Sequence, residues 1–210
     1  MARHREACDE ITGRTKGPFV LDAGTGMYLN ALLLDIPIAP RVSEDVRQQA
    51  QVISTEESNP RRASRKAELE MSGAKPRGSI WDAPLRYETE LLYMRPDREE
   101  LDSAISERSS IIAYEGLEEV ANLIGSFPDG IPNHSVRDSI GVRELTEYLK
   151  GQITFKEAER QILTRTRQLS RRQIRWFDKL TRAISGRASI LISYDRRTSE
   201  SAIYDYVSRG

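Results

Sequence analysis

Cysteine and histidine are scarce in this sequence of 210 residues. Its single cysteine, Cys8, excludes a disulfide within the chain and points to a reducing, cytoplasmic location. The two histidines, His4 and His134, are isolated, which argues against a zinc site.

Long apolar runs are also missing. No segment approaches the ~20 apolar residues that a membrane-spanning helix requires, so we expect no membrane contact. The charged residues at the N-terminus are not followed by an apolar run, which argues against a signal peptide. A net charge is absent too, because 32 basic residues balance 32 acidic ones.

The distribution of charge is informative where the total is not. Residues 97–119 carry eight acidic residues against Arg98 and Arg108. Residues 160–187 carry nine lysines or arginines against the single acid Asp178. Such a one-sided basic segment indicates a phosphate-rich partner.

Short apolar runs alternate with longer helical segments. Three runs are typical of strands: residues 18–21, 87–94 and 188–194. Capping residues and hydrophobic periodicity predict helices. These helices cover residues 2–12, 27–34, 61–71, 97–124, 135–149 and 154–184, with weaker helical character over 43–58. The sequence therefore predicts an α/β fold that is rich in helix.

A glycine-rich turn follows the first predicted strand. Gly24, Thr25 and Gly26 would let a ligand approach the backbone, and the next helix would offer free N–H groups to an anion. Asp22, at the end of that strand, could hold Mg²⁺. A tight turn without a ligand and a solvated acid are the alternative interpretations.

The longest predicted helix has two unlike faces. At 100° per residue, one face is expected to pack, and it holds Ala158, Ile162, Thr166, Leu169, Gln173, Phe177 and Leu180. The opposite side gathers Arg160, Arg167, Arg171, Arg175 and Arg182, with Arg165, Arg172 and Trp176 between. Arginine suits bidentate contact with phosphate and an aromatic ring can stack on an unpaired base, so we favour a nucleic-acid partner over a merely solvated face. From sequence alone, by contrast, we expect Arg108 to form an ordinary helix salt bridge, with the neighbours of Glu107 or with Asp102.

Several segments match one family in the same order along the chain. They are Pro18-Phe-Val-Leu-Asp-Ala-Gly-Thr-Gly-Met-Tyr-Leu-Asn-Ala-Leu32, Asn59-Pro-Arg-Arg-Ala-Ser-Arg-Lys-Ala-Glu-Leu-Glu70, residues 97–120, Ser139-Ile-Gly-Val-Arg-Glu-Leu145, Tyr148-Leu-Lys-Gly-Gln-Ile153 and Thr166-Arg-Gln-Leu-Ser-Arg-Arg-Gln-Ile-Arg-Trp-Phe177. Together they resemble the C-terminal two-thirds of the tRNA dimethylallyltransferases, which are also called tRNA isopentenyltransferases or IPP transferases. The last of these segments is long and specific.

The resemblance implies an incomplete P-loop-NTPase-like parallel sheet of about three strands, with a large helical C-terminal part. Residues 1–42 would be a remnant of the α/β core, residues 43–72 a reduced tRNA-binding insert, and residues 73–210 the return to the core with the helical tRNA-binding region. The family reaction transfers a dimethylallyl group from dimethylallyl diphosphate to N6 of the adenosine 3′ of the anticodon, after the base is flipped out.

The resemblance also implies roles for individual residues. Thr25 and Arg108 would be catalytic, and with Gly24 and Gly26 they would bind the diphosphate, so resemblance overrides the salt-bridge interpretation of Arg108. Mg²⁺ would be the cofactor. The anticodon stem-loop of tRNA would be held by Arg137, Arg143, Arg167, Arg171, Arg172, Gln173 and Trp176.

One departure from the family pattern bears on activity. The sequence holds no Gly-x-x-x-x-Gly-Lys-Ser/Thr motif, and the family's P-loop and general-base aspartate would lie upstream of residue 1. We therefore expect the isolated chain to be inactive, and strands near Val20 and Leu92 to lack their central neighbour. The alternatives are a split subunit that needs a P-loop-bearing chain, a non-catalytic tRNA-binding remnant, a decayed gene product, and an adenylate isopentenyltransferase. The extended basic helix argues against the last of these.

Overall fold

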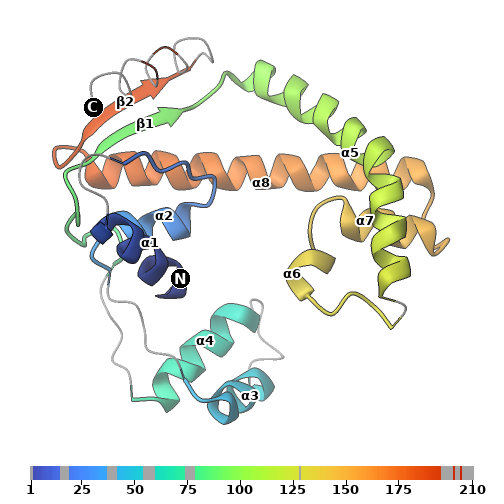
Figure 1. The fold of residues 1–210 in the computed structure, drawn as a ribbon, viewed down its shortest axis with the longest axis horizontal. Coiled ribbons are helices and arrows are strands. Elements are labelled where there is room, and N and C mark those ends of the chain that lie inside the picture. The colour runs from blue at the N-terminus through green and yellow to red at the C-terminus, as the bar shows by residue number, and fades with distance from the viewer. Residues whose placement is uncertain are drawn as a thin grey trace. The chain divides into compact units, whose positions relative to one another are not determined.

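A computed structural model describes residues 2–14, 19–36, 42–53, 60–73, 79–127 and 129–194, with residues 201 and 204 (Figure 1). The elements are α1 (Ala2–Arg14), α2 (Gly26–Leu33), α3 (Glu44–Ile53), α4 (Pro60–Met71), β1 (Glu90–Met94), α5 (Arg98–Ser126), α6 (His134–Arg137), α7 (Val142–Leu149), α8 (Phe155–Ile184) and β2 (Ser189–Ser193). None of the described helices is both long enough and apolar enough to span a membrane.

The chain divides into two compact units. Unit 1 comprises Met1–Thr89 and Leu180–Ser189, and unit 2 comprises Glu90–Lys179 and Ile190–Gly210. The segment boundaries expected after residues 42 and 72 lie beside stretches outside the described residues and stay a prediction.

The sheet has two strands, β1 and β2, which run parallel. The amide of Ser189 donates to the carbonyl of Thr89 at 3.2 Å, and the amide of Arg95 donates to the carbonyl of Ser193 at 2.7 Å. The α/β class is therefore confirmed, and two of the three predicted strands form.

The strand predicted over residues 18–21 is wrong for the part that is described. Phe19, Val20 and Leu21 are not in a strand, and their exposed fractions are 42, 67 and 40%. A strand persists only where its backbone N–H and C=O groups find a neighbouring strand. No described segment of the chain pairs with these three residues.

Arg86 connects α1 and α2 in unit 1 through side-chain hydrogen bonds. Its Nη2 donates to both carboxylate oxygens of Asp9 on α1 at 2.9 Å, and its Nη1 donates to the carbonyl of Leu32 in α2 at 3.2 Å. The Tyr87 hydroxyl adds a third hydrogen bond to Asp9, at 3.1 Å. Partial burial raises the pKa of Asp9, but the hydrogen bonds from Arg86 and Tyr87 outweigh it and leave the pKa lowered.

Helices α3 and α4 pack against each other. Ala50 of α3 and Glu68 of α4 are buried, and Arg65 compensates the Glu68 carboxylate at 2.5 Å one turn away. The predicted helical segment 43–58 is thus a helix as far as Ile53, and residues 54–59 lie outside the described part of the chain.

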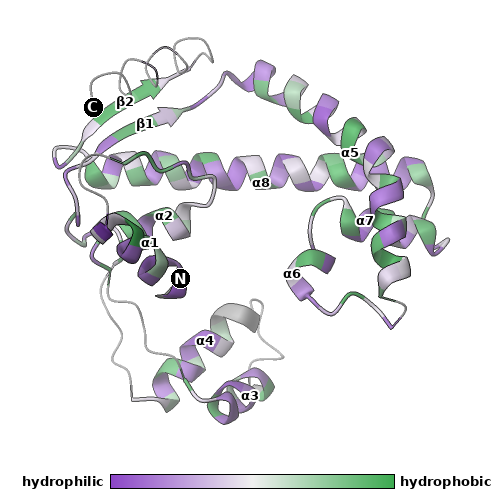
Figure 2. Ribbon diagram, viewed as in Figure 1, coloured by the Kyte–Doolittle hydropathy of each residue, from purple (hydrophilic) through white to green (hydrophobic). Residues whose placement is uncertain are grey.

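Three helices build the core of unit 2. Ala113 and Val120 of α5, Leu145 of α7 and Ile162 of α8 form a buried cluster, around which partly buried apolar side chains gather. Figure 2 shows apolar and polar residues interleaved along α8, as a helix with one packed side requires. The Asp97 cap predicted for α5 is present, because its Oδ1 accepts from the amide of Glu99 at 2.7 Å.

The continuous helix predicted over residues 135–149 is wrong. It is broken into α6 and α7 by the turn of residues 138–141, whose last residue, Gly141, has a φ of 96° in the left-handed region. A Cβ on Gly141 would stand 2.7 Å from Cγ2 of Ile112 on α5. The close approach of α5 therefore requires a glycine here, at the N-cap position from which α7 begins.

Replacing Gly141 with alanine should destabilise unit 2. Left-handed backbone strain and the clash with Ile112 together predict a loss of about 2–4 kcal/mol. Thermal unfolding followed by circular dichroism would measure it. Gly116→Ala is the matched control, because its Cβ would meet Leu145 Cδ1 at an ordinary 3.5 Å within a helix. That control should be neutral or slightly stabilising, and an equal loss in both variants would contradict the argument.

Asp9 should make unit 1 sensitive to acid. Because its folded pKa is lowered, the carboxylate contributes stability above its unfolded pKa near 3.8 and loses it as the pH falls through the lower folded value. The stability difference between the wild type and Asp9→Asn should therefore be present at pH 7 and shrink below about pH 4. Unfolding by urea at several pH values tests this, with Glu6→Gln on the same helix as control. A stability difference between the wild type and Asp9→Asn that stays the same at every pH would contradict this explanation.

Candidate nucleic-acid interface

The glycine-rich turn of unit 1 forms the start of α2. Thr25 is the N-cap residue, and its carbonyl accepts from the amides of Tyr28 and Leu29 at 3.1 and 3.2 Å. Its side chain is exposed and makes no capping hydrogen bond. Gly24 is exposed and Gly26 is buried. The turn thus presents a hydroxyl group and the first amides of a helix, which suit an anion.

Asp22 does not assemble a metal site with its neighbours. Its carboxylate is exposed, and the described residues contain no group of three or more His, Cys, Asp or Glu that could hold an ion. A Mg²⁺ ion needs several oxygen ligands, so Asp22 alone does not fit the cofactor expected from the family resemblance.

Arg108 projects from the acidic helix α5 and is exposed. The helix salt bridge that sequence alone suggested between Arg108 and Asp102 is wrong, because Asp102 instead contacts Arg167 Nε on α8 at 3.4 Å. Residues six apart lie on different faces of a helix, so the two could not meet. Among the described ion pairs, none involves Arg108, which leaves its guanidinium available to an external anion.

The middle of α8 presents its arginines to solvent. Arg171 and Arg172 are exposed, whereas Arg167, Gln173 and Trp176 are half-buried. A surface pocket here is lined by Gln168, Arg171, Arg172, Ile174 and Arg175. The structure thus brings together five of the predicted tRNA-binding residues along one helix, and the other two, Arg137 and Arg143, lie on α6 and α7.

The packed face predicted for α8 forms only at the two ends of the helix. Ala158, Ile162 and Leu180 are fully buried, but Leu169 in the middle is 39% exposed. Between Ile162 and Leu180 no residue is buried. The central arginines therefore stand on a stretch of helix with little packing of its own.

Asp178, the single acid of the basic segment, is bound by Tyr93 of β1 and by Arg95, the residue that follows β1. It accepts from the Tyr93 hydroxyl at 3.1 Å and from Arg95 Nε at 3.0 Å. Burial, and then the neighbouring Asp178, raise the pKa of Tyr93 to about 12, so the phenol stays protonated as a donor. Among the described ion pairs, this acid is paired with Arg95.

Sequence reasoning missed the role of Glu144. This carboxylate is fully buried, and it accepts from the amide of Gly141 at 2.9 Å and from Arg165 on α8. Arg165 also donates to the carbonyl of Asp138 at 2.7 Å. The one available signal was an acid three residues after Gly141, the position from which a side chain can cap the start of a helix.

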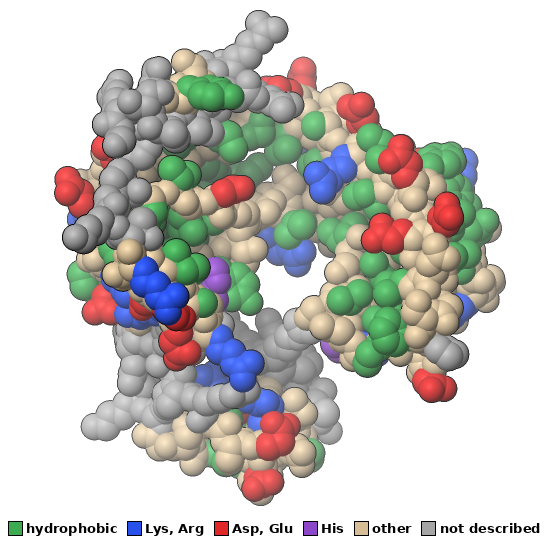
Figure 3. Space-filling view, in the orientation of Figure 1, with side chains coloured by type: hydrophobic (Ala, Val, Ile, Leu, Met, Phe, Trp, Pro, Cys, Tyr) green, Lys and Arg blue, Asp and Glu red, His purple; other side chains and the backbone are tan. Residues whose placement is uncertain are grey.

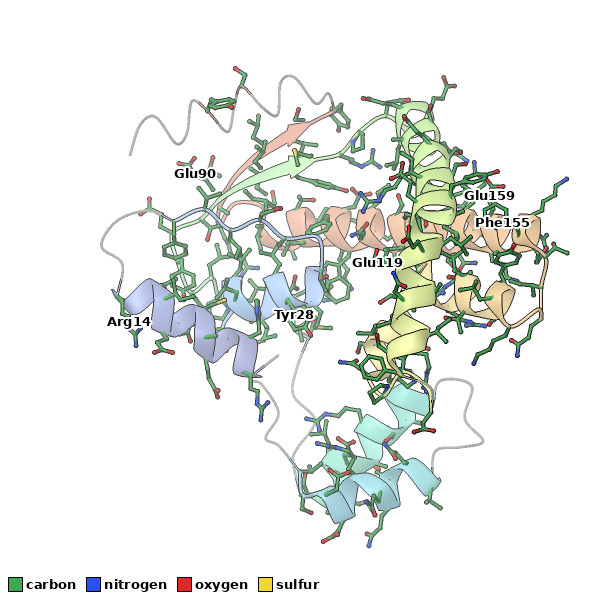
Figure 4. All side chains as sticks on the ribbon, turned by 45° about the vertical axis from the view of Figure 1, so that its right-hand side comes forward. Arg14, Tyr28, Glu90, Glu119, Phe155 and Glu159 are labelled. Carbon is green, nitrogen blue, oxygen red and sulfur yellow. The ribbon has the colours of Figure 1, made fainter. Side chains whose placement is uncertain are left out.

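Opposite charges segregate between the helices of unit 2. Figure 3 shows acidic side chains following α5, in agreement with the acidic composition of residues 97–119. Figure 4 labels Phe155 and Glu159 on α8 beside α5, where Ser110 donates to Glu159 at 3.0 Å. The acids of α8 near its N-terminus are thus partly engaged with α5, while its later turns carry the arginines.

Known proteins place this arrangement in a family. The family model described as IPP transferase matches residues 52–180. A tRNA dimethylallyltransferase of Rubrobacter xylanophilus is 51% identical over 195 residues, covering 92% of this chain and 67% of that protein. One from Rickettsia felis is 29% identical over 203 residues, covering 83% of this chain and 64% of that protein.

Solved structures agree on the fold. A tRNA isopentenylpyrophosphate transferase from Staphylococcus epidermidis superimposes with a TM-score of 0.60 at 23% identity, over 100% of this chain and 75% of that one. A full-length one from Bacillus halodurans gives 0.58 at 21% identity, over 99% of this chain and 72% of that one. The chain spans about two-thirds of the length of the curated relatives it matches, and it belongs to the IPP transferase family, in the C-terminal part that these tRNA dimethylallyltransferases share.

Proposed function

We propose that this chain is the tRNA-binding and diphosphate-binding part of a tRNA dimethylallyltransferase. The observation that carries the proposal is the arginine-rich middle of α8, whose only acid, Asp178, is bound to Tyr93 and Arg95. An unbalanced basic surface with an aromatic residue beside it fits a folded RNA with an unpaired loop.

In the proposed reaction, N6 of the target adenine attacks C1 of dimethylallyl diphosphate. The bond from C1 to oxygen breaks, diphosphate leaves, and the amine loses a proton to a general base. Arg108, which lacks a carboxylate partner among the described residues, would neutralise the charge that develops on the leaving diphosphate. For Thr25, in unit 1, the proposed role rests on the family resemblance alone: its hydroxyl and the amides of its turn would bind a substrate anion.

This half of the site needs a second half from outside the sequence. A general-base aspartate and a P-loop are required by the family resemblance, and the 210 residues hold no P-loop motif. A Mg²⁺ ion would also need ligands beyond Asp22. The exposed backbone at residues 19–21 and the two-stranded sheet are where a further strand, from the same or another chain, would add.

A non-catalytic tRNA-binding protein is the second candidate function. It is favoured by the same missing motif together with the intact arginine surface of α8. Binding tests therefore address both candidates, whereas a transfer assay separates them. The cytoplasmic location expected from the single cysteine stays a prediction.

Changing Arg167, Arg171 and Arg172 together to alanine should weaken tRNA binding. Each lost phosphate contact removes about 0.7 from the slope of log affinity against log salt, so we expect the slope to fall by about two. Fluorescence anisotropy of labelled tRNA between 50 and 300 mM salt measures this.

The matched control changes Arg98, Lys150 and Lys156 to alanine. These three residues are exposed, lie in unit 2 and remove the same charge away from the arginine surface. Equal slopes for the two triple variants would show that only net charge matters, and the proposed interface would then be wrong.

Arg108 should matter for chemistry more than for RNA affinity. In a fusion that adds the N-terminal third of the Rubrobacter xylanophilus relative, Arg108→Ala should lower kcat by about 10²-fold, because a donor to developing charge is lost. Transfer of radiolabelled dimethylallyl to tRNA gives kcat, and anisotropy gives the affinity.

Two controls accompany this measurement. The 210-residue chain alone should give no transfer, and Arg98→Ala in the fusion should behave like the unchanged fusion. If Arg108→Ala keeps full kcat, its assignment to the diphosphate fails. Transfer by the isolated chain would overturn the requirement for a second half.

A further inference from the structure

A second pocket lies between α7 and α8 in unit 2, and Arg143 is the only one of its residues that the family resemblance assigns to the anticodon arm. It is lined by Arg143 of α7 and by Arg160, Gln161, Thr164 and Arg165 of α8. No carboxylate is among its described lining residues. Guanidinium groups and an amide can donate to an oxyanion, whereas the Thr164 hydroxyl already donates to the carbonyl of Arg160 at 2.8 Å.

The arginines of this pocket keep donors unused. Arg143 donates through Nε to Glu147 at 3.1 Å, and neither of its terminal nitrogens donates to a described residue. Arg160 uses Nε and Nη2 on Glu157, at 3.0 and 2.7 Å, which leaves Nη1. An anion could therefore add to these two ion pairs without breaking them, since each guanidinium has five N–H groups.

Arg165 lines the pocket with a side chain that is held in place by two partners. Only 29% of its side chain is exposed, and it is fixed by the buried Glu144 and by the carbonyl of Asp138. Glu144 in turn holds the Gly141 amide that begins α7, the helix carrying Arg143. The buried carboxylate thus sets the spacing of the arginines on the two helices before any ligand arrives.

The placement on α8 favours an extended polyanion over a small one. At 100° per residue, Arg160, Thr164, Arg167 and Arg171 lie within about 60° of one another on the helix surface. Arg160 and Arg171 are about 16 Å apart along the axis, at 1.5 Å per residue. One RNA strand could therefore occupy both this pocket and the proposed anticodon-arm surface.

We infer that the pocket of Arg143, Arg160 and Gln161 binds a backbone phosphate of the RNA, through donors of Arg160 and Gln161 to which the family resemblance assigns no role. This inference rests on the proposed tRNA binding and adds a separate contact to it. The contact is to phosphate, so it contributes affinity and register and does not read the sequence.

The test compares Arg143→Gln/Arg160→Gln with Lys150→Gln/Lys156→Gln in the full chain. Both pairs remove two exposed charges from α7, α8 or the turn between them, but the lysines do not line the pocket. The pocket variant should bind labelled tRNA roughly 3- to 10-fold more weakly at 150 mM salt, with a salt slope smaller by about one. The lysine control should keep the wild-type slope.

Three outcomes would overturn the inference, and they differ from one another. Equal slopes for the two double variants, while the triple variant at Arg167, Arg171 and Arg172 still loses binding, would refute the pocket alone. Salt-independent or absent tRNA binding by the wild type would refute the proposed function as well. Loss of inorganic diphosphate binding in calorimetry, with tRNA affinity unchanged, would assign the pocket to a small anion instead.

Discussion

The buried carboxylate of Glu144 is the contact on which the arrangement of unit 2 depends. A charge removed from water is tolerated only when it is paired and hydrogen-bonded, and here Arg165 and the Gly141 amide provide both. Because these partners come from α8 and from the turn before α7, one carboxylate fixes how the two helices meet. The apolar cluster around Leu145 supplies the burial, but it is less directional than this charge pair.

The acids near α8 are used for structure, and that use leaves the arginines to function. Asp178 is bound by Tyr93 and Arg95, and Glu144 by Arg165. Asp102 contacts Arg167 at 3.4 Å, whereas no ion pair among the described residues involves Arg171 or Arg172. A basic surface can thus persist on a chain whose total charge is zero.

The sequence predicted the helices well where periodicity and capping agreed, as at Asp97 before α5. It failed at two places for identifiable reasons. Residues 19–21 have the composition of a strand, but a strand is made by its neighbour, which local sequence cannot supply. The helix expected over residues 135–149 is interrupted before Gly141, where Ile112, twenty-nine positions earlier, leaves no room for a Cβ.

The candidate site divides in the same way. The one-sided distribution of arginines on α8 was recognised in the sequence. The role expected of Arg108 came only from the family resemblance. The partners of Asp102, Glu144 and Asp178 were not predictable, since each pairs with a residue far along the chain.

The absence of any buried residue between Ile162 and Leu180 has a consequence for how this protein can change. Within that stretch, exposed positions such as Arg171 and Arg172 contribute to no core, so substitutions there should change the surface of α8 and leave the fold intact. In the proposed complex with RNA, these exposed positions are where new RNA preferences could arise without a search for a new fold.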